Sequence, residues 1–140
     1  MYGKIAIVYD GSRADFEKMA EAVAEGVKEA NGEPDLFTAE EFNTYMPYSY
    51  SGIAVGLPMF EKGKDLDTKM GRLYNALKPR LQGKRVGLFT SRDGDENWLP
   101  HIERDIRGAG VILESESILA DGEPTDDILD QCRRLGREIV

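Results

Sequence analysis

The sequence predicts a single α/β domain over residues 1–140: a doubly wound, five-stranded parallel sheet in the order 2-1-3-4-5, with helices on both faces. Short apolar runs, typical of strands buried on both faces, alternate with segments whose apolar residues recur at helical spacing. The alternation continues through five units without a repeat or a linker. Right-handed crossovers leave few topologies, and of the common ones this order fits 140 residues best.

The first unit has the clearest pattern. Residues 3–9 are nearly all apolar and predict a buried strand. An amphipathic helix that ends at Asn31-Gly32 is predicted next, with an inward face formed by Phe16, Met19, Ala20, Val23, Ala24 and Val27. Residues 33–38 predict a short second strand, which Pro34 weakens.

The later units follow the same rule. Strands are predicted at residues 52–57, at 85–90 and from 110 to 114 or beyond. Helices are predicted at 66–77, from about residue 98 to residue 106, and from Thr125 onward. Three tyrosines lie in the polar segment 39–51, and we expect them to pack under the edge of the sheet: Tyr45, Tyr48 and Tyr50.

Charge and cysteine content exclude several classes of function. With 18 Lys and Arg against 26 Asp and Glu, the net charge of −8 argues against binding to nucleic acid or to anionic membranes. No apolar run approaches the roughly 20 residues that span a bilayer, and no signal peptide is predicted, so we expect a cytoplasmic protein. Cys132, the only cysteine, is expected to be a core thiol, and His101 a solvated surface residue. The sequence sets no oligomeric state.

Ligands of such sheets bind beyond the carboxyl ends of the strands, at the topological switch point. The loops at residues 10–16, 58–65 and 91–98 are predicted to meet there. The first of them joins a buried strand to a helix N-terminus, where free N–H groups and the positive end of the helix dipole favour a phosphate.

The chain resembles a flavodoxin, most nearly the flavodoxin domains fused to diiron oxygen/nitric oxide reductases. The likeness spans the whole chain and is carried by Ile7-Val8-Tyr9-Asp10, Glu17-Lys18-Met19-Ala20-Glu21-Ala22, Ala54-Val55-Gly56-Leu57-Pro58, Val86-Gly87-Leu88-Phe89-Thr90-Ser91 and Leu135-Gly136-Arg137-Glu138-Ile139. It implies a flavodoxin-like fold, an FMN cofactor and electron transfer. The protein would then be an electron carrier, with no catalytic side chains of its own.

The resemblance also implies which residues would bind FMN. The phosphate would lie, mostly on backbone N–H groups, at Asp10, Gly11, Ser12, Arg13, Ala14, Asp15 and Phe16. The isoalloxazine ring would lie between two further groups, Pro58, Met59, Phe60 and Glu61 on one side and Ser91, Arg92, Asp93, Gly94 and Trp98 on the other. The acidic rim would steer a redox partner protein with a basic surface.

The phosphate loop departs from the hydroxyl-rich pattern of the family. Gly11 stands at the first hydroxyl position, Ala14 at the glycine, Asp15 at the asparagine and Phe16 at the final threonine. Like charges about 4 Å apart cost about 4 kcal/mol at an effective dielectric near 20, whereas a helix dipole returns only about 0.3–1 kcal/mol. Asp10, Asp15 and Glu17 would therefore repel a phosphate. Ser12-x-x-Asp15 is also an acidic form of the capping box, in which the helix caps itself.

The sequence is compatible with three functions. They are FMN-dependent electron transfer, a flavodoxin-fold binding or assembly module that has lost FMN, and binding of another anionic or sugar ligand through Arg13 and Arg92. Two of the ring residues also have structural alternatives. Trp98 either stacks on the flavin or packs on the start of the third helix, and Phe60 either faces the ring or covers an apolar surface.

Overall fold

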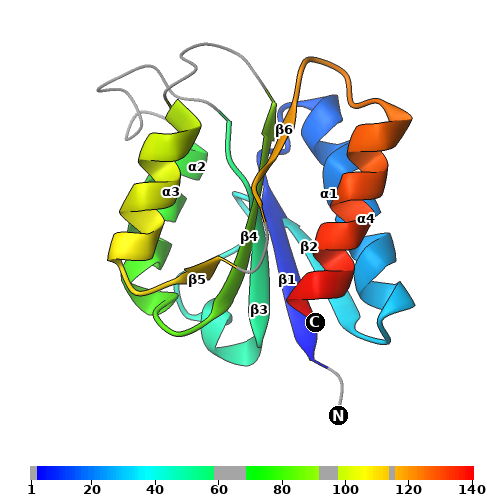
Figure 1. Ribbon diagram of the computed structural model, residues 1–140. Coiled ribbons are helices and arrows are strands. Elements are labelled where there is room, and N and C mark those ends of the chain that lie inside the picture. Colours follow the sequence, from blue (N-terminus) through cyan, green and yellow to red (C-terminus); the bar gives the residue numbers. More distant parts are fainter. Residues whose placement is uncertain (1–2, 59–68, 92–97, 114–115) are drawn as a thin grey trace.

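The computed structural model describes residues 3–58, 69–91, 98–113 and 116–140. Figure 1 shows one central sheet between two layers of helices. One face carries α1 (Ala14–Glu29) and α4 (Asp126–Ile139), and the other carries α2 (Lys69–Leu77) and α3 (Trp98–Gly108). Two short 3-10 helices complete the helical segments, η1 (Met46–Ser49) and η3 (Lys78–Arg80). This arrangement confirms the predicted α/β class with helices on both faces.

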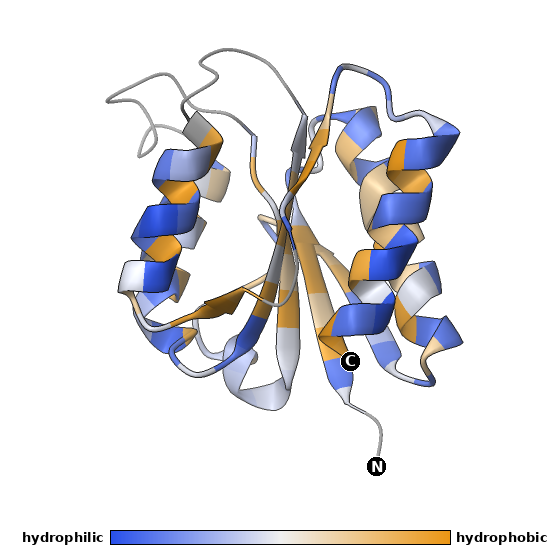
Figure 2. Ribbon diagram, in the orientation of Figure 1, coloured by the Kyte–Doolittle hydropathy of each residue, from blue (hydrophilic) through white to orange (hydrophobic). Residues whose placement is uncertain are grey.

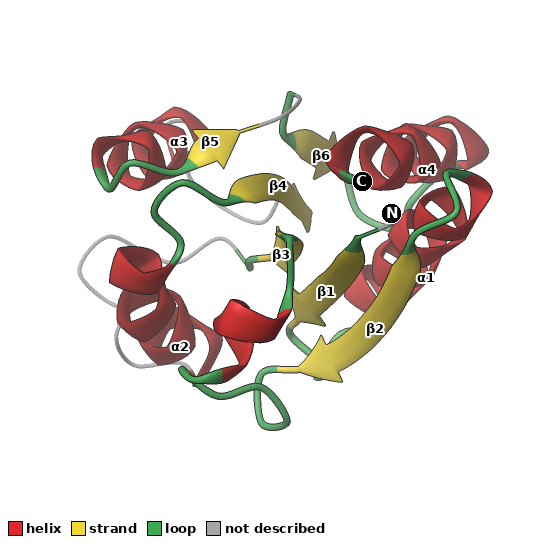
Figure 3. Ribbon diagram, turned by 90° about the horizontal axis from the view of Figure 1, so that it is seen from below, coloured by secondary structure: helices red, strands yellow, loops and turns green. Residues whose placement is uncertain are grey.

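The strands pair in parallel in the order β2-β1-β3-β4-β5, which confirms the predicted order. They are β1 (Lys4–Tyr9), β2 (Glu33–Thr38), β3 (Gly52–Gly56), β4 (Arg85–Ser91) and β5 (Ile112–Leu113), with a further short strand, β6 (Ile118–Ala120), beside β4. Figure 3, seen from below, shows β2 at one edge of the sheet. Proline has no N–H to donate to a neighbouring strand, so Pro34 is tolerated in an edge strand such as β2 but would remove a hydrogen bond from a central strand.

The last strand differs from the prediction of one strand from residue 110 to 114 or beyond. It consists of two pieces, because β5 pairs with the start of β4 and β6 with its end. Between the pairs Val86–Leu113 and Phe89–Ile118, β4 advances by three residues while its partner advances by five. In sequence, the polar run Glu114-Ser115-Glu116-Ser117 separates the two apolar pieces.

Each face of the sheet has its own apolar core. Figure 2 shows hydrophobic residues along the strands and on the sides of the helices that face them. Phe16 and Met19 of α1 pack with Leu135 and Ile139 of α4 on one face, all of them buried. Cys132 belongs to the same cluster, and burial raises the pKa of its thiol to about 12. The predicted core thiol is thereby confirmed.

Helix α1 ends where the sequence predicts, but its left-handed residue is an asparagine. Asn31 has φ 65°, while the Gly32 N–H donates to the Val27 carbonyl and the Asn31 N–H donates to the Lys28 carbonyl. These two hydrogen bonds form a Schellman motif with asparagine in the position that glycine usually occupies. The C-terminal end of α1 therefore depends on the ability of asparagine to adopt a positive φ.

The three tyrosines of the segment 39–51 do not behave alike. Tyr50 is 7% exposed, packs against Phe37 and Phe42, and donates its hydroxyl to Asp35, as expected for a residue under the sheet edge. The expectation is wrong for Tyr45 and Tyr48, which are 77% and 69% exposed. Tyr45 precedes η1 and Tyr48 lies within it, so the 3-10 turn leaves both rings in solvent.

Within the described ranges, no helix is long and apolar enough to cross a membrane.

Candidate functional site

The carboxyl ends of the strands lie together at the upper edge of the sheet in Figure 1. Tyr9 of β1 pairs with Gly56 of β3, and Gly56 pairs with Phe89 of β4. Just beyond β3, the Leu57 amide donates to the Phe89 carbonyl (3.1 Å), and the Thr90 hydroxyl donates to the Leu57 carbonyl (2.6 Å). The segments that follow β1, β3 and β4 therefore leave the sheet from one edge, where a ligand of such a sheet binds.

Asp10 folds the segment after β1 into a tight turn. Its Oδ1 accepts hydrogen bonds from the Ser12 amide (3.0 Å) and the Ser12 hydroxyl (2.7 Å), which makes an Asx turn. Gly11 lies against the end of β2, since a Cβ at this position would lie 2.7 Å from Cγ2 of Thr38. Both donors of Ser12 are thus occupied within the loop itself.

Helix α1 begins with Arg13 as its N-cap, and Arg13 makes no side-chain capping bond. The predicted capping box from Ser12 to Asp15 is wrong, because the Ser12 hydroxyl donates to Asp10. Asp15 instead accepts hydrogen bonds from the Phe16 amide (3.1 Å) and from Nη2 of Arg13 (3.0 Å). The Arg13 guanidinium also lies 5.0 Å from the centroid of the Phe16 ring. One of the first helical amides, that of Phe16, thus still donates to a carboxylate, although not in the pattern of a capping box.

Phe16 stands at the position of the family's final threonine, yet its side chain belongs to the core. It is fully buried, with its ring centroid 6.4 Å from that of Phe89. Of the seven predicted phosphate-loop residues, Phe16 alone is buried in this way, while Gly11, Ser12 and Ala14 are exposed. Phe16 could contact a ligand at this loop only through its backbone.

The β1–α1 junction offers a phosphate a favourable backbone and unfavourable side chains. The amides of Ala14 and Asp15 lie in the first helical turn and have no hydrogen-bond partner among the residues that the structure describes. They lie at the positive end of the helix dipole, where an anion is stabilised. Asp15 and Glu17 place carboxylates in this turn, Asp10 adds another just before it, and Arg13 is already paired with Asp15. The junction therefore fits an FMN phosphate in its backbone but not in its side-chain charge.

The surroundings of Tyr9, at the end of β1, show the same negative field. Burial raises the pKa of Tyr9, and the nearby carboxylates of Glu17, Glu41 and Glu21 raise it further. Glu41 accepts hydrogen bonds from the Thr38 amide and hydroxyl, which lower the pKa of its carboxyl. An anionic ligand at this end of the sheet would meet several fixed negative charges.

The residues that the resemblance predicts around the flavin ring are only partly described. Pro58 is buried directly after β3, and Ser91 is buried at the end of β4, where its hydroxyl donates to the Gly122 carbonyl (3.3 Å). Trp98 is the first residue of α3. The other predicted ring residues lie outside the described residues: Met59, Phe60, Glu61, Arg92, Asp93 and Gly94.

The segment between β6 and α4 also lies beside the predicted phosphate loop, and the sequence reasoning missed it. A hollow of about 410 Å³ lies beside the start of α1, lined by Arg13, Ala14, Asp15, Lys18, Gly122 and Glu123. Lys18 of α1 forms an ion pair with Glu123 across it. The rule that ligands bind at carboxyl ends also applies to the last strand, so Gly122-Glu123-Pro124 could have been included from the sequence.

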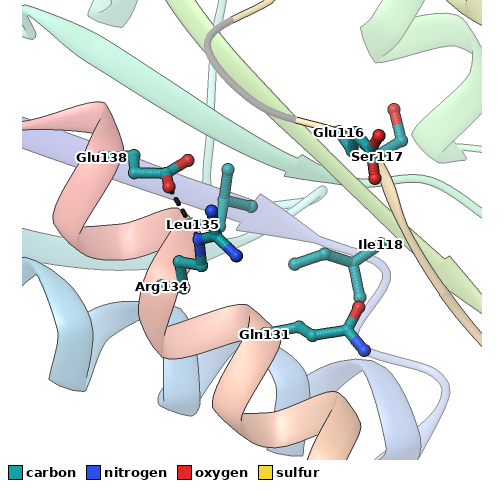
Figure 4. Close-up of a pocket in the computed structure, with 7 residues that line it drawn as sticks. All are labelled: Glu116, Ser117, Ile118, Gln131, Arg134, Leu135 and Glu138. Carbon is teal, nitrogen blue, oxygen red and sulfur yellow. Dashed lines mark hydrogen bonds and ion pairs between the residues drawn. The ribbon is translucent and has the colours of Figure 1, made fainter.

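A larger hollow, of about 750 Å³, lies along α4, away from the predicted site (Figure 4). Side chains of α4 face those of the segment that enters β6, and the lining consists of Glu116, Ser117, Ile118, Gln131, Arg134, Leu135 and Glu138. Arg134 pairs with Glu138 on the next turn of the helix (2.9 Å). None of the predicted site residues that the structure describes lines this hollow.

Other kinds of site find little support in the part of the chain that the structure describes. His101 is exposed, as expected. No three His, Cys, Asp or Glu side chains among the described residues come together in a way that could hold a metal ion.

Comparisons with known proteins agree with this geometry. No protein-family model matches the chain. It is 23% identical over 135 residues to a flavodoxin of Clostridium beijerinckii, which covers 96% of this chain and 97% of the relative. The solution structure of two-electron reduced Megasphaera elsdenii flavodoxin superposes with a TM-score of 0.82 at 26% identity, over 96% of this chain and 97% of that one.

The same fold occurs inside a longer protein. The flavodiiron core of Flv1 from Synechocystis superposes with a TM-score of 0.82 at 20% identity, over 97% of this chain but only 34% of that chain. The chain therefore has the flavodoxin fold and its strand order, and it is similar in sequence to flavodoxins over nearly its whole length.

Proposed function

We propose that this protein is an FMN-dependent electron carrier. The observation that carries the proposal is the likeness to a flavodoxin whose solved structure is its two-electron reduced form, over 96% of this chain and 97% of that one. The β1–α1 junction supports it, because two first-turn amides at the carboxyl edge have no partner among the described residues. FMN, when bound, would supply the redox chemistry, and the protein would supply position and electrostatics.

The residues of this chain would divide the work between the two ends of the cofactor. The segment from Asp10 to Phe16 would receive the phosphate, mainly on the amides of Ala14 and Asp15. The segments from Pro58 to Glu61 and from Ser91 to Trp98 would bracket the ring and exclude water from it. Thr90 and Ser91 would hold these segments in place, since their hydroxyls donate to the carbonyls of Leu57 and Gly122.

The proposal is tested by FMN titration, followed by the quenching of flavin fluorescence, with a variant that removes one of the two amides. Ala14 is the first helical residue, where proline is well tolerated, and Arg13 before it already has extended dihedrals of φ −127° and ψ 126°. Ala14→Pro should therefore fold and weaken FMN binding by about tenfold or more, since a hydrogen bond to a charged group contributes about 1.5–3 kcal/mol and 1.4 kcal/mol is a factor of about ten. Riboflavin, which has no phosphate, should bind the variant and the parent equally. An equal loss for both flavins would contradict this role of the loop.

A second function is favoured by the carboxylates of the loop. If Asp10 and Asp15 keep the donors of the loop permanently occupied, the fold would serve as a binding or assembly module without a flavin. This alternative predicts that neither FMN nor riboflavin changes its fluorescence when mixed with the purified protein at concentrations well above 1 μM. Saturable quenching by either flavin would reject it.

A further inference from the structure

In the predicted phosphate loop, residues 10–16, two carboxylates already occupy hydrogen-bond donors that a phosphate would use. Four donors that a phosphate would use at this place are the amide and hydroxyl of Ser12, the amide of Phe16 and the guanidinium of Arg13. The carboxylate of Asp10 accepts the first two, and the carboxylate of Asp15 accepts the other two, all at 2.7–3.1 Å. A carboxylate and a phosphate are acceptors of the same kind, so they compete for these donors.

The arrangement leaves little gain for a phosphate. The Asp15 side chain is only 15% exposed and lies against Arg13, so it does not simply swing into solvent when a ligand arrives. A phosphate would also enter beside three carboxylates, those of Asp10, Asp15 and Glu17, and Arg13 is already paired with Asp15. The amides of Ala14 and Asp15 still attract it. Attraction by the backbone and repulsion by the side chains therefore act against each other at this loop.

We propose that the carboxylates of Asp10 and Asp15 cancel the affinity that the backbone of this loop offers to the flavin phosphate, so that the protein binds riboflavin at least as tightly as FMN. The inference rests on the proposed function, because it presumes that the crevice takes a flavin. It adds that the phosphate is not the group that the protein selects.

The experiment compares FMN and riboflavin on the parent protein and on the double variant Asp10→Asn/Asp15→Asn. Asparagine keeps the acceptor oxygen that the Asx turn needs but removes the charge. We expect the double variant to bind FMN about tenfold more tightly than the parent, a change of about 1.4 kcal/mol, with riboflavin affinity nearly unchanged. The single variant Asp15→Asn should show a smaller shift in the same direction, which keeps the test valid if the double variant folds poorly.

A matched control is available at another helix N-terminus. Asp126→Asn/Asp127→Asn removes two exposed carboxylates from the first turn of α4, with the same change in net charge. This control should leave the ratio of the two affinities as it is in the parent. An equal gain in FMN affinity in the control would overturn the inference, because the effect would then come from net charge alone.

The outcomes separate this inference from the proposed function. A parent that binds FMN more tightly than riboflavin would overturn the inference and leave FMN-dependent electron transfer in place. A parent that binds neither flavin, with a double variant that gains FMN binding, would support the role of the carboxylates and reject the proposed function of the natural chain. If neither protein binds either flavin, both proposals are rejected.

Discussion

Single side chains decide which groups the β1–α1 loop presents to a ligand. Ser12 has a hydroxyl that two local motifs can use, and the spacing to Asp15 fits a capping box. Asp10 offers a competing acceptor two residues before Ser12 and takes both of its donors. A sequence pattern cannot rank these two arrangements, because both satisfy the same polar groups. The acidic character of the loop, in contrast, could be read directly from its residues.

Phe16 gives a prediction at this scale. Because its ring is fully buried against Phe89, Phe16→Thr would leave a cavity and a buried hydroxyl in place of an aromatic ring. We expect it to lower the free energy of unfolding by about 3 kcal/mol or more, measured by urea denaturation. Glu17→Thr, on the exposed side of the same turn, should cost less than about 1 kcal/mol. Similar losses in the two variants would contradict the burial of Phe16 described here.

Helices α1 and α4 approach each other closely because each has a glycine at the contact. A Cβ on Gly136 would collide with the Val23 carbonyl, and a Cβ on Gly26 would collide with the Arg133 carbonyl. Ion pairs then join the exposed sides of the two helices, including Arg133 to Glu25 (2.9 Å). The pair of helices fixes the start of α1 beside the segment between β6 and α4, and so shapes the hollow that both of them line.

The glycine contact predicts a large effect of one methyl group. Gly136→Ala should lower the free energy of unfolding by about 1–3 kcal/mol, because the clash is with backbone that cannot rotate away. Gly108→Ala, in α3, meets no heavy atom within 4 Å and should be neutral or slightly stabilising. The comparison requires only thermal or urea denaturation of the two variants. Equal stability of both would show that α1 and α4 do not pack in this way.

Asp105 gives a prediction for the contact between α2 and α3. Its carboxylate accepts hydrogen bonds from the Tyr74 hydroxyl (2.9 Å) and from Nζ of Lys78 (2.8 Å). Burial by itself would raise the pKa of Asp105, but the hydrogen bonds from Lys78 and Tyr74 outweigh it and lower this pKa. A carboxyl whose pKa is lower in the folded state stabilises the fold above its ordinary pKa and loses that contribution as the pH falls through the folded value.

We therefore expect Asp105→Asn to be less stable than the parent at pH 7 and to lose less stability between about pH 5 and about pH 3. Urea denaturation at a series of pH values measures both effects. Asp121→Asn, on an exposed loop, is the control and should follow the parent curve. If the Asp105→Asn curve runs parallel to that of the parent, the carboxyl does not contribute to stability through its ionised form.

For the molecule as a whole, the sequence predicted the sheet order and the edge at which the candidate site lies, because both follow from the alternation of strands and helices. It did not predict that Gly122 and Glu123 lie beside the phosphate loop. Their position depends on where the last strand ends, and the strand runs to Ala120 in a second piece whose pairing with β4 is a matter of register. A pattern of two or three apolar residues is too short to reveal such a piece.

The net charge of −8 predicts the behaviour of the proposed carrier toward its partner. If an acidic surface steers a basic redox protein, the second-order rate of electron transfer from the FMN-loaded protein should fall by about tenfold or more as ionic strength rises. Reduction by an uncharged small molecule serves as the control and should not change with salt. A rate to the basic protein that is independent of ionic strength would contradict electrostatic steering.

The most direct test of the central claim is whether the purified protein retains FMN and passes electrons through it. The protein is mixed with one equivalent of FMN, free flavin is removed by filtration, and the absorption spectrum is followed during anaerobic reduction and reoxidation. We predict that the protein fraction stays yellow, bleaches on reduction and recovers its colour when an electron acceptor is added. A colourless protein fraction, with all of the flavin in the filtrate, would contradict the claim that this flavodoxin-like chain is an FMN-dependent electron carrier.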